Sequence, residues 1–327
     1  MRRSALLLSV LVAVTACSPS DSASTTTTAG GESTTTTGET TSTIATTTTP
    51  ASLFPVTVEA DNGSVVIGSR PAAIVSLSSV ATEMLFEIGA GPQVIAVDDQ
   101  SNYPPDAPMT DLSGFTPNLE AILSLDPDLV VISFDPGDLA AGLEAAGVPV
   151  LGYGAALTID DVYRQIQALG TATGNLEVAG KVIDRIRGDL AELVATSGDL
   201  GNGLSYYHEI DNQLYTVTSA TFFGEIYALF GLANIADAAD EDGSAFGYPQ
   251  LSSEYIVSAN PDIVFLADAR YGESEETVAA RPGWDSLSAV QTGNVVELDA
   301  DIASRWGPRI VELAASIAGA LEEYHRG

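Results

Sequence analysis

Two hydrophobic periods alternate along most of the chain. Short apolar runs rich in Val and Ile are followed by longer segments whose apolar residues recur every three or four positions. The first pattern is typical of buried β-strands, and the second is typical of amphipathic helices. Repeated strand–helix–strand units with short connections predict parallel sheets covered by helices on both faces.

The pattern begins with a predicted β-hairpin, because apolar and polar residues alternate on both sides of Asp61-Asn62-Gly63. Predicted strands and helices then alternate through the segments 72–78, 79–90, 94–99, 118–125, 128–133, 137–147 and 148–154. The alternation restarts after Gly198, with strands predicted at 204–210, 214–219, 262–267 and 294–301 and helices at 222–231, 252–259 and 307–325. The chain is therefore predicted to form two α/β lobes.

Helices are predicted at 159–173 and 176–196, between the two sets of strands. In the second helix Val178, Val182, Ile186 and Leu190 follow a period near 3.6. At 1.5 Å per residue this helix is about 31 Å long, which is the diameter of a small domain. The chain is thus divided at 54–174, 175–197 and 198–327, with the long helix as the middle part.

One segment occurs twice, at 118–133 and at 252–267. Each copy has a Glu (Glu120, Glu254), an apolar turn, Pro-Asp with the Asp eight residues after the Glu, and a buried strand. Turn chemistry explains Pro-Asp. Two explanations remain for each Glu: an acid at a helix start gains about 0.3–1 kcal/mol from the dipole, or the two acids dock matching cations of a symmetric partner.

The N-terminal 1–17 segment is predicted to be a lipoprotein signal peptide. It has two arginines, a short apolar run and small residues before Cys17, which is the chain's one cysteine and resembles a lipobox cysteine. An ordinary signal peptide with an incidental cysteine is the alternative. Residues 18–53 are mostly Thr, Ser and Gly, a composition that predicts a disordered tether. We therefore expect an extracytoplasmic protein attached to the cell membrane by a lipid anchor only.

Charge excludes one class of partner. The sequence has 44 acidic and 12 basic residues, for a formal net charge of −32. Such a surface repels nucleic acid phosphates, so no nucleic-acid binding is predicted. The acidic residues are otherwise explained as a solvated surface.

Several segments resemble the substrate-binding proteins of ABC importers for iron complexes, haem and cobalamin. They include "IVSLSSVATEMLFEIGAG", both copies of the repeated segment, and "RPGWDSLSAVQTGNVVELDADIASRWGPRIVEL". The resemblance runs from about residue 56 to the last helix. It implies two Rossmann-like lobes with parallel sheets joined by a single long helix, and a ligand cleft between the lobes. It also implies that Glu120 and Glu254 engage arginines of a dimeric ABC permease, and that the protein is a monomer.

Aromatic residues gather in the loops predicted to follow the strands, where open parallel sheets bind ligands. The resemblance implies that the ligand is bound by Ser79, Tyr103, Phe115 and Phe134 in the first lobe and by Tyr207, Tyr248 and Arg305 in the second. An internal ion pair is the alternative for Arg305. A small-molecule ligand with a large planar body is expected. With few cations present, a corrinoid is preferred slightly over a neutral or cationic ferric chelate.

Other chemistry has weaker support. His208 is a candidate axial haem ligand, but strand alternation places Tyr207 and Glu209 on the opposite face from it. The acid clusters 98–99 and 240–242 are better explained as solvated loops than as Ca²⁺ sites. The HExxH, GxSxG and Walker A motifs are absent, so neither an enzyme nor a resident cofactor or metal is predicted. A surface adhesin or structural lipoprotein, or an extracytoplasmic cleft enzyme, remains the alternative.

Overall fold

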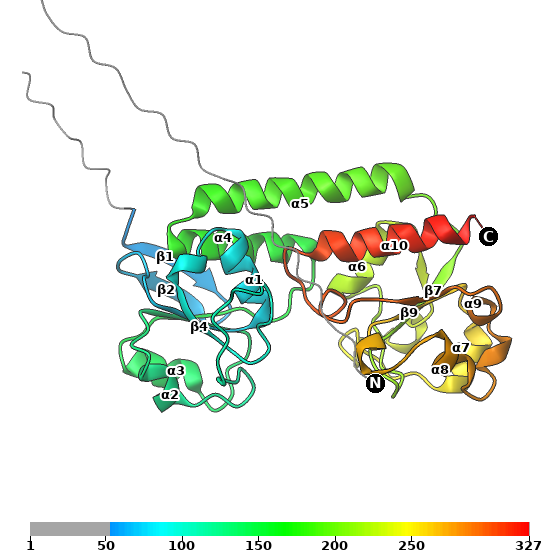
Figure 1. Cartoon of the computed structure of the whole chain (residues 1–327), viewed down its shortest axis with the longest axis horizontal. Helices are drawn as coiled ribbons and strands as arrows, with labels where there is room; N and C mark the ends of the chain where they lie inside the picture. Colours follow the sequence, from blue (N-terminus) through cyan, green and yellow to red (C-terminus); the bar gives the residue numbers. More distant parts are fainter. Residues whose placement is uncertain (1–52, 327) are drawn as a thin grey trace, which may run out of the picture. The chain divides into compact units, whose positions relative to one another are not determined.

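The computed structural model describes residues 53–326, which contain two four-stranded parallel sheets (Figure 1). The first consists of β3 (Ile74–Leu77), β4 (Val94–Val97), β5 (Leu129–Ile132) and β6 (Val150–Gly152). The second consists of β7 (Ser205–Glu209), β8 (Ala233–Asn234), β9 (Ile263–Leu266) and β10 (Val295–Glu297). The predicted fold, two α/β lobes with parallel sheets, is confirmed. The signal peptide, Cys17 and nearly all of the predicted tether lie outside the described residues.

The two sheets share one topology. Their strand orders are β4-β3-β5-β6 and β8-β7-β9-β10. In each lobe the first strand is central, the second lies on one side of it, and the third and fourth lie on the other. The repeated segment of the sequence therefore occupies the same place in both lobes.

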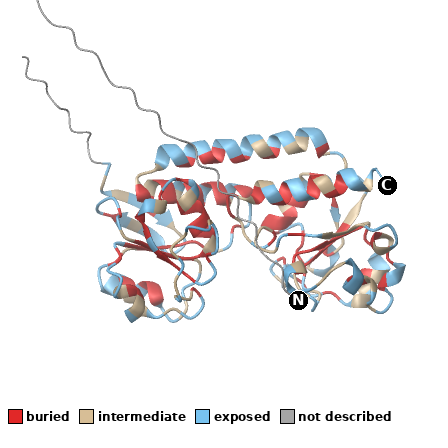
Figure 2. Cartoon of the chain, in the orientation of Figure 1, coloured by how far each residue is buried: buried red, intermediate tan, exposed pale blue. Residues whose placement is uncertain are grey.

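Helices cover these sheets and bury their apolar faces against them (Figure 2). The first lobe contains α1 (Ser79–Glu87), α2 (Leu119–Leu123), α3 (Leu139–Ala145) and α4 (Ile159–Thr173). The second contains α6 (Phe222–Ala228), α7 (Ser253–Ala259), α8 (Glu275–Ala279), α9 (Ser288–Gln291) and α10 (Ile310–Tyr324). Single 3₁₀ turns lie at Gly91–Gln93, Asp237–Ala239, Ala269–Tyr271 and Trp284–Ser286.

The predicted hairpin is formed by β1 (Val56–Ala60) and β2 (Gly63–Ile67). Gly63 has φ +114°, which the tight turn requires and a side chain would oppose. The Asn62 amide at the turn donates to Val150 O at 3.0 Å and accepts from Gly152 N at 2.9 Å. The turn residues thereby fix the hairpin to β6, at the edge of the first sheet.

Helix α5 (Leu176–Ser197) connects the lobes and is the longest helix of the described part. It packs against α4 in the first lobe and α10 in the second (Figure 1). A Cβ added at Gly170 of α4 would lie 2.5 Å from the Ala179 Cβ, so glycine lets α4 and α5 approach closely. No helix among residues 53–326 has both the length and the apolar composition needed to cross a membrane.

The prediction of a β-strand at 214–219 is wrong. This segment makes only an isolated bridge between Tyr215 and Gln250. Leu214 has φ +68°, and its N–H donates to Asp211 O at 3.0 Å. The turn at 211–214 therefore interrupts the extended backbone that the β-branched residues favour.

The Pro-Asp of the repeated segment has the same structural role in both lobes. The Asp128 carboxylate accepts from the backbone N–H groups of Ala72 and Ala73 at 2.9 and 3.0 Å. The Asp262 carboxylate accepts from the N–H and the hydroxyl of Ser205 at 2.8 and 2.9 Å. Each aspartate thus binds the turn before the third strand to the start of the central strand.

Candidate ligand-binding cleft

A cleft of about 570 Å³ lies between the lobes, at the carboxyl ends of their strands. Ser78 follows β3, Asp98 follows β4 and Ser133 follows β5, while Ala267 follows β9 on the other side. Ligands of open parallel sheets bind at this edge because the strand-end loops converge there. The volume is within the range of small-molecule sites.

Aromatic side chains form much of the cleft surface. Phe115 and Phe134 of the first lobe have ring centroids 5.4 Å apart and remain 61% and 53% exposed. Tyr248, Tyr271 and Trp306 line the opposite side. Exposed rings held at such positions bind flat apolar surfaces of a ligand.

A buried carboxylate and several hydroxyls give the cleft its polar groups. Asp98 is 3% exposed and accepts a hydrogen bond from the Ser101 hydroxyl at 2.5 Å. Burial raises the pKa of Asp98 above its ordinary value. The Ser133 hydroxyl donates to Ser78 Oγ at 2.5 Å, which fixes both at the first-lobe wall. These groups are suited to orienting hydrogen-bonding substituents of a ligand.

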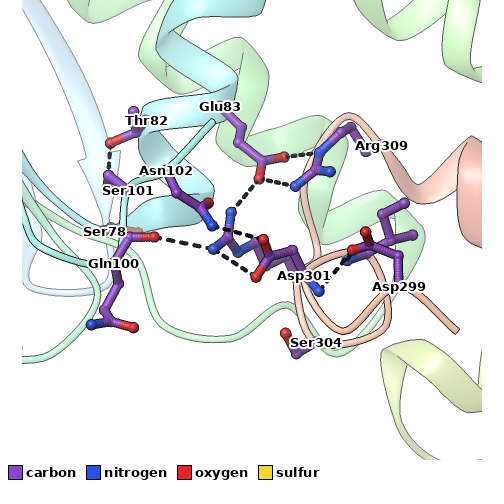
Figure 3. A network of polar contacts seen from close by, with 12 residues as sticks. Ser78, Thr82, Glu83, Gln100, Ser101, Asn102, Asp299, Asp301, Ser304 and Arg309 are labelled. Carbon is purple, nitrogen blue, oxygen red and sulfur yellow. Dashed lines mark hydrogen bonds and ion pairs between the residues drawn. The ribbon is translucent and has the colours of Figure 1, made fainter. Parts of the chain in front are cut away.

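Beside the cleft, an ion cluster joins the two lobes (Figure 3). The Glu83 carboxylate on α1 accepts from Arg305 Nη1 at 2.8 Å and from Arg309 Nε and Nη2 at 3.0 and 2.6 Å. Both arginines lie between β10 and α10 of the second lobe. Glu83 is 3% exposed, so these partners provide the hydrogen bonds that its buried carboxylate needs. We call Glu83, Arg305 and Arg309 the interlobe latch.

Asp301 extends the latch toward the cleft. It accepts from Arg305 Nη2 at 3.1 Å, from Arg270 Nη1 at 2.9 Å and from Asn102 Nδ2 of the first lobe at 2.8 Å. Arg305 also donates to Gln100 O at 3.1 Å. The side chains of Asn102 and Asp301 face each other across the lobes in Figure 3. The two arginines that line the cleft are therefore both paired with Asp301.

Five of the residues predicted to bind ligand line this cleft: Ser79, Phe115, Phe134, Tyr248 and Arg305. Arg305 also makes the internal ion pair that the sequence left as its alternative. Tyr103 is outside the lining, and its ring lies 4.2 Å below the guanidinium of Arg309.

The placement of Tyr207 is a correction. Its side chain is fully buried on the far face of β7, where its ring contacts Trp284 edge-on at 6.1 Å between centroids. His208, the next residue, lines the cleft instead. The predicted alternation of side chains along this strand is present, and the cleft lies on the side of His208.

Comparisons with known proteins agree with this geometry. A family model described as periplasmic binding protein matches residues 74–302. The chain belongs to the periplasmic binding protein family.

Individual relatives of this binding protein cover most of its chain. The cobalamin-binding protein of Halobacterium salinarum is 33% identical over 282 residues, 83% of this chain and 75% of the relative. The uncharacterized ABC transporter substrate-binding lipoprotein YvrC of Bacillus subtilis is 29% identical over 82% of this chain and 86% of its own. The crystal structure of the vitamin B12 binding protein BtuF of Vibrio cholerae has a TM-score of 0.65 at 27% identity, covering 78% of this chain and 98% of that structure.

Some residues lining the cleft of this binding protein were not predicted from the sequence. Arg270 and Tyr271 follow β9, in a loop that was not recognised as a strand end facing the cleft. The sequence could have indicated these two residues, because the strand 262–267 was predicted and the carboxyl end of a parallel strand lies at the ligand-binding edge of the sheet. Glu83, which lies beside the cleft, gave no such signal, because its partners lie more than 200 positions away in the chain.

The C-terminal lobe of the binding protein also contains a buried acid cluster. Arg281 donates to both carboxylate oxygens of Glu209 at 2.6 Å and to Glu273 at 2.7 Å. Asp268 is 2% exposed, and neither of its carboxylate oxygens has a hydrogen-bond partner among the described residues. Burial, and then the charge of Glu209, raise the pKa of Asp268 to about 7.

Replacing Asp268 by Asn is expected to stabilise the protein at alkaline pH. The pKa of Asp268 is raised on folding from 3.8 to about 7, so its contribution to stability is present below pH 3.8 and is lost as pH rises through 7. We expect D268N to be about 2 kcal/mol more stable than wild type at pH 8, with a smaller difference at pH 5. Urea unfolding at both pH values measures this. A constant difference between the two would contradict it.

Proposed function

We propose that this protein captures a corrinoid or a ferric chelate outside the cytoplasm and delivers it to an ABC importer. The observation that carries the proposal is the aromatic cleft between two lobes of matching topology. Relatives named for binding cobalamin and vitamin B12 support it. Family members are binding proteins, and the proposal therefore contains no catalytic step.

The charges of the cleft favour a ligand without strong negative charge. Arg270 and Arg305 are both occupied by Asp301, and Arg305 also by Glu83. The buried Asp98 adds an acidic group on the first-lobe wall of the cleft. An anionic catecholate would have to displace these carboxylates from the arginines. A corrinoid, which combines a large flat ring with amide groups, is our first choice and a neutral or cationic ferric chelate the second.

The two repeated glutamates are proposed to contact the importer. Glu120 lies in the first turn of α2 behind the Asn118 cap, and Glu254 lies in the first turn of α7 behind the Ser252 cap. Both are exposed, and neither carboxylate has an ion pair or hydrogen bond within residues 53–326. Acids left free at equivalent sites of two lobes suit a permease dimer whose cations are related by twofold symmetry.

Attachment to the membrane is also part of the proposal. We propose that Cys17 carries the lipid and that residues 18–53 form the tether from which the two lobes and their linking helix, 54–327, extend. The name of the Bacillus subtilis relative, a lipoprotein, supports this attachment. Mass spectrometry of the membrane fraction tests it, with C17A as the matched variant expected to be released in soluble form.

Quenching of Trp fluorescence tests ligand binding. The chain has two tryptophans, of which Trp306 lines the cleft and Trp284 is fully buried in the second lobe. The protein is titrated with cyanocobalamin, haemin and neutral and anionic ferric siderophores. A compound that binds is expected to quench the Trp fluorescence of wild type and W284F, whereas most of this quenching should be absent in W306F. Cyanocobalamin is expected to bind most tightly. If none of these compounds binds in equilibrium dialysis, the proposed function is wrong.

A further inference from the structure

His208 makes one hydrogen bond, at the wall of the cleft. Its Nδ1 lies 2.9 Å from the Tyr227 hydroxyl, and its ring stacks on Phe223 with centroids 6.2 Å apart. The side chain lines the cleft but is only 1% exposed. Nδ1 is taken up by the Tyr227 hydroxyl on α6, whereas Nε2 has no hydrogen-bond partner among residues 53–326 and is the ring nitrogen available to a ligand.

Tyr227 is the residue whose hydroxyl contacts Nδ1 of His208. It is completely buried among apolar side chains, and Nδ1 of His208 is the one hydrogen-bond partner of its hydroxyl in the described part. If Nδ1 carried the proton, it would donate to the tyrosine oxygen and the phenolic O–H would have no acceptor. An unsatisfied buried donor costs about 1–3 kcal/mol.

The same burial opposes the charged form of His208. Desolvation lowers the pKa of His208 to about 4, so the ring is neutral near pH 7 and carries one proton. With Tyr227 donating to Nδ1, that proton is on Nε2. A nitrogen that carries a proton has no free lone pair for a metal.

We propose that Tyr227 fixes His208 as the Nε2–H tautomer, so that His208 offers the cleft a hydrogen-bond donor and not a metal ligand. The group recognised is an acceptor oxygen of the bound molecule, such as an amide carbonyl. This part of the inference rests on the proposed function, whereas the tautomer does not. The cleft then has a donor on the second-lobe wall and the acceptor Asp98 on the first-lobe wall, a pair that suits a primary amide.

NMR of protein labelled with ¹⁵N-histidine tests the tautomer directly. The chain has two histidines, so H325N assigns the spectrum. Long-range ¹H–¹⁵N correlations are expected to show His208 as a single Nε2–H tautomer that does not titrate between pH 5.5 and 8. Y227F is expected to populate both tautomers. Y207F is the matched control, since the hydroxyl that it removes from the neighbouring residue is buried and has no hydrogen-bond partner within residues 53–326. It should leave the His208 signals unchanged.

Two binding measurements test recognition. With cyanocobalamin as probe, H208F is expected to bind about tenfold more weakly than H208Q, because Gln keeps an N–H donor and Phe does not. With haemin as the metal probe, His208 is not expected to coordinate the iron. Wild type and H208Q should therefore give the same haemin spectrum.

Each result decides a separate part of the inference. An Nδ1–H or charged His208 in wild type at pH 7, or a low-spin haemin band that H208Q abolishes, would overturn the tautomer assignment. Equal affinities of H208F and H208Q for cyanocobalamin would overturn recognition through the donor. If wild type binds no compound of the panel, the proposed function fails while the NMR result still stands.

Discussion

Replacing Glu83 by Gln is expected to lower the free energy of unfolding by about 3 kcal/mol, because it leaves buried guanidinium groups without their counter-charge. Arg309 would lose the one carboxylate with which it forms an ion pair in the described part and would keep the neutral amide oxygen of E83Q and the ring of Tyr103, whereas Arg305 would still have Asp301. The loss should therefore come mainly from Arg309. Urea or thermal unfolding of the purified variant measures it.

Glu87 provides the matched control, because it lies on the same helix and also pairs with an arginine. The Glu87–Arg185 pair is 2.6 Å long, but its side chains are 40% and 46% exposed. Exposed pairs contribute about 0–1 kcal/mol, so E87Q should be nearly as stable as wild type. E83M/R309M, which removes both charges, should recover part of the loss. If E83Q and E87Q have equal effects, the latch contributes nothing to stability.

The fold was predictable because strand and helix patterns repeat in this chain with little ambiguity. The run 129–132 is apolar throughout and is buried on both faces in β5, as parallel strands require. The prediction of a strand at 214–219 was wrong because it rested on side-chain composition alone. The turn at Leu214 depends instead on the positive backbone φ of that residue. β-propensity gives no information about such a turn.

The cleft was predictable only in part, because strand alternation gives relative and not absolute orientation. The sequence places Tyr207 and His208 on opposite faces of β7, but the positions of α6 and Trp284 decide which face meets the cleft. The positions of Phe115 and Phe134 at the cleft were easier to predict, because both residues lie in loops beyond strand ends. Contacts between the lobes, such as Glu83 with Arg309, require the placement of both lobes and cannot be read from local patterns.

The latch and the cleft share one residue, so the contact between the lobes is connected with the charge of the ligand. Arg305 lines the cleft and at the same time pairs with Glu83 and Asp301. A ligand that competes for its guanidinium must therefore weaken a contact between the lobes. A ligand bound by aromatic surfaces and by Asp98 leaves the latch intact. This difference explains why we place corrinoids and neutral chelates before anionic siderophores.

The largest functional effect is expected for the double variant E120A/E254A, which should bind ligand normally and fail in transport. Neither glutamate lines the cleft, and both are exposed in the first turn of their helices. Their removal therefore leaves the binding site unchanged. Loss of one partner from a charge pair that is buried on docking costs about 2–5 kcal/mol, so each single variant should slow uptake at least about tenfold.

E144A and E276A are the matched controls, because each removes an exposed acid from the same lobe at another helix. Uptake of the bound compound into proteoliposomes that contain the permease should be unchanged by them, although the net charge changes equally. Rates should also fall as salt rises for wild type but hardly for the double variant, since screening acts on the charges that have been removed. Equal uptake by the double variant and wild type would remove the docking role. Weakened ligand binding in the double variant would show instead that these acids act on the cleft.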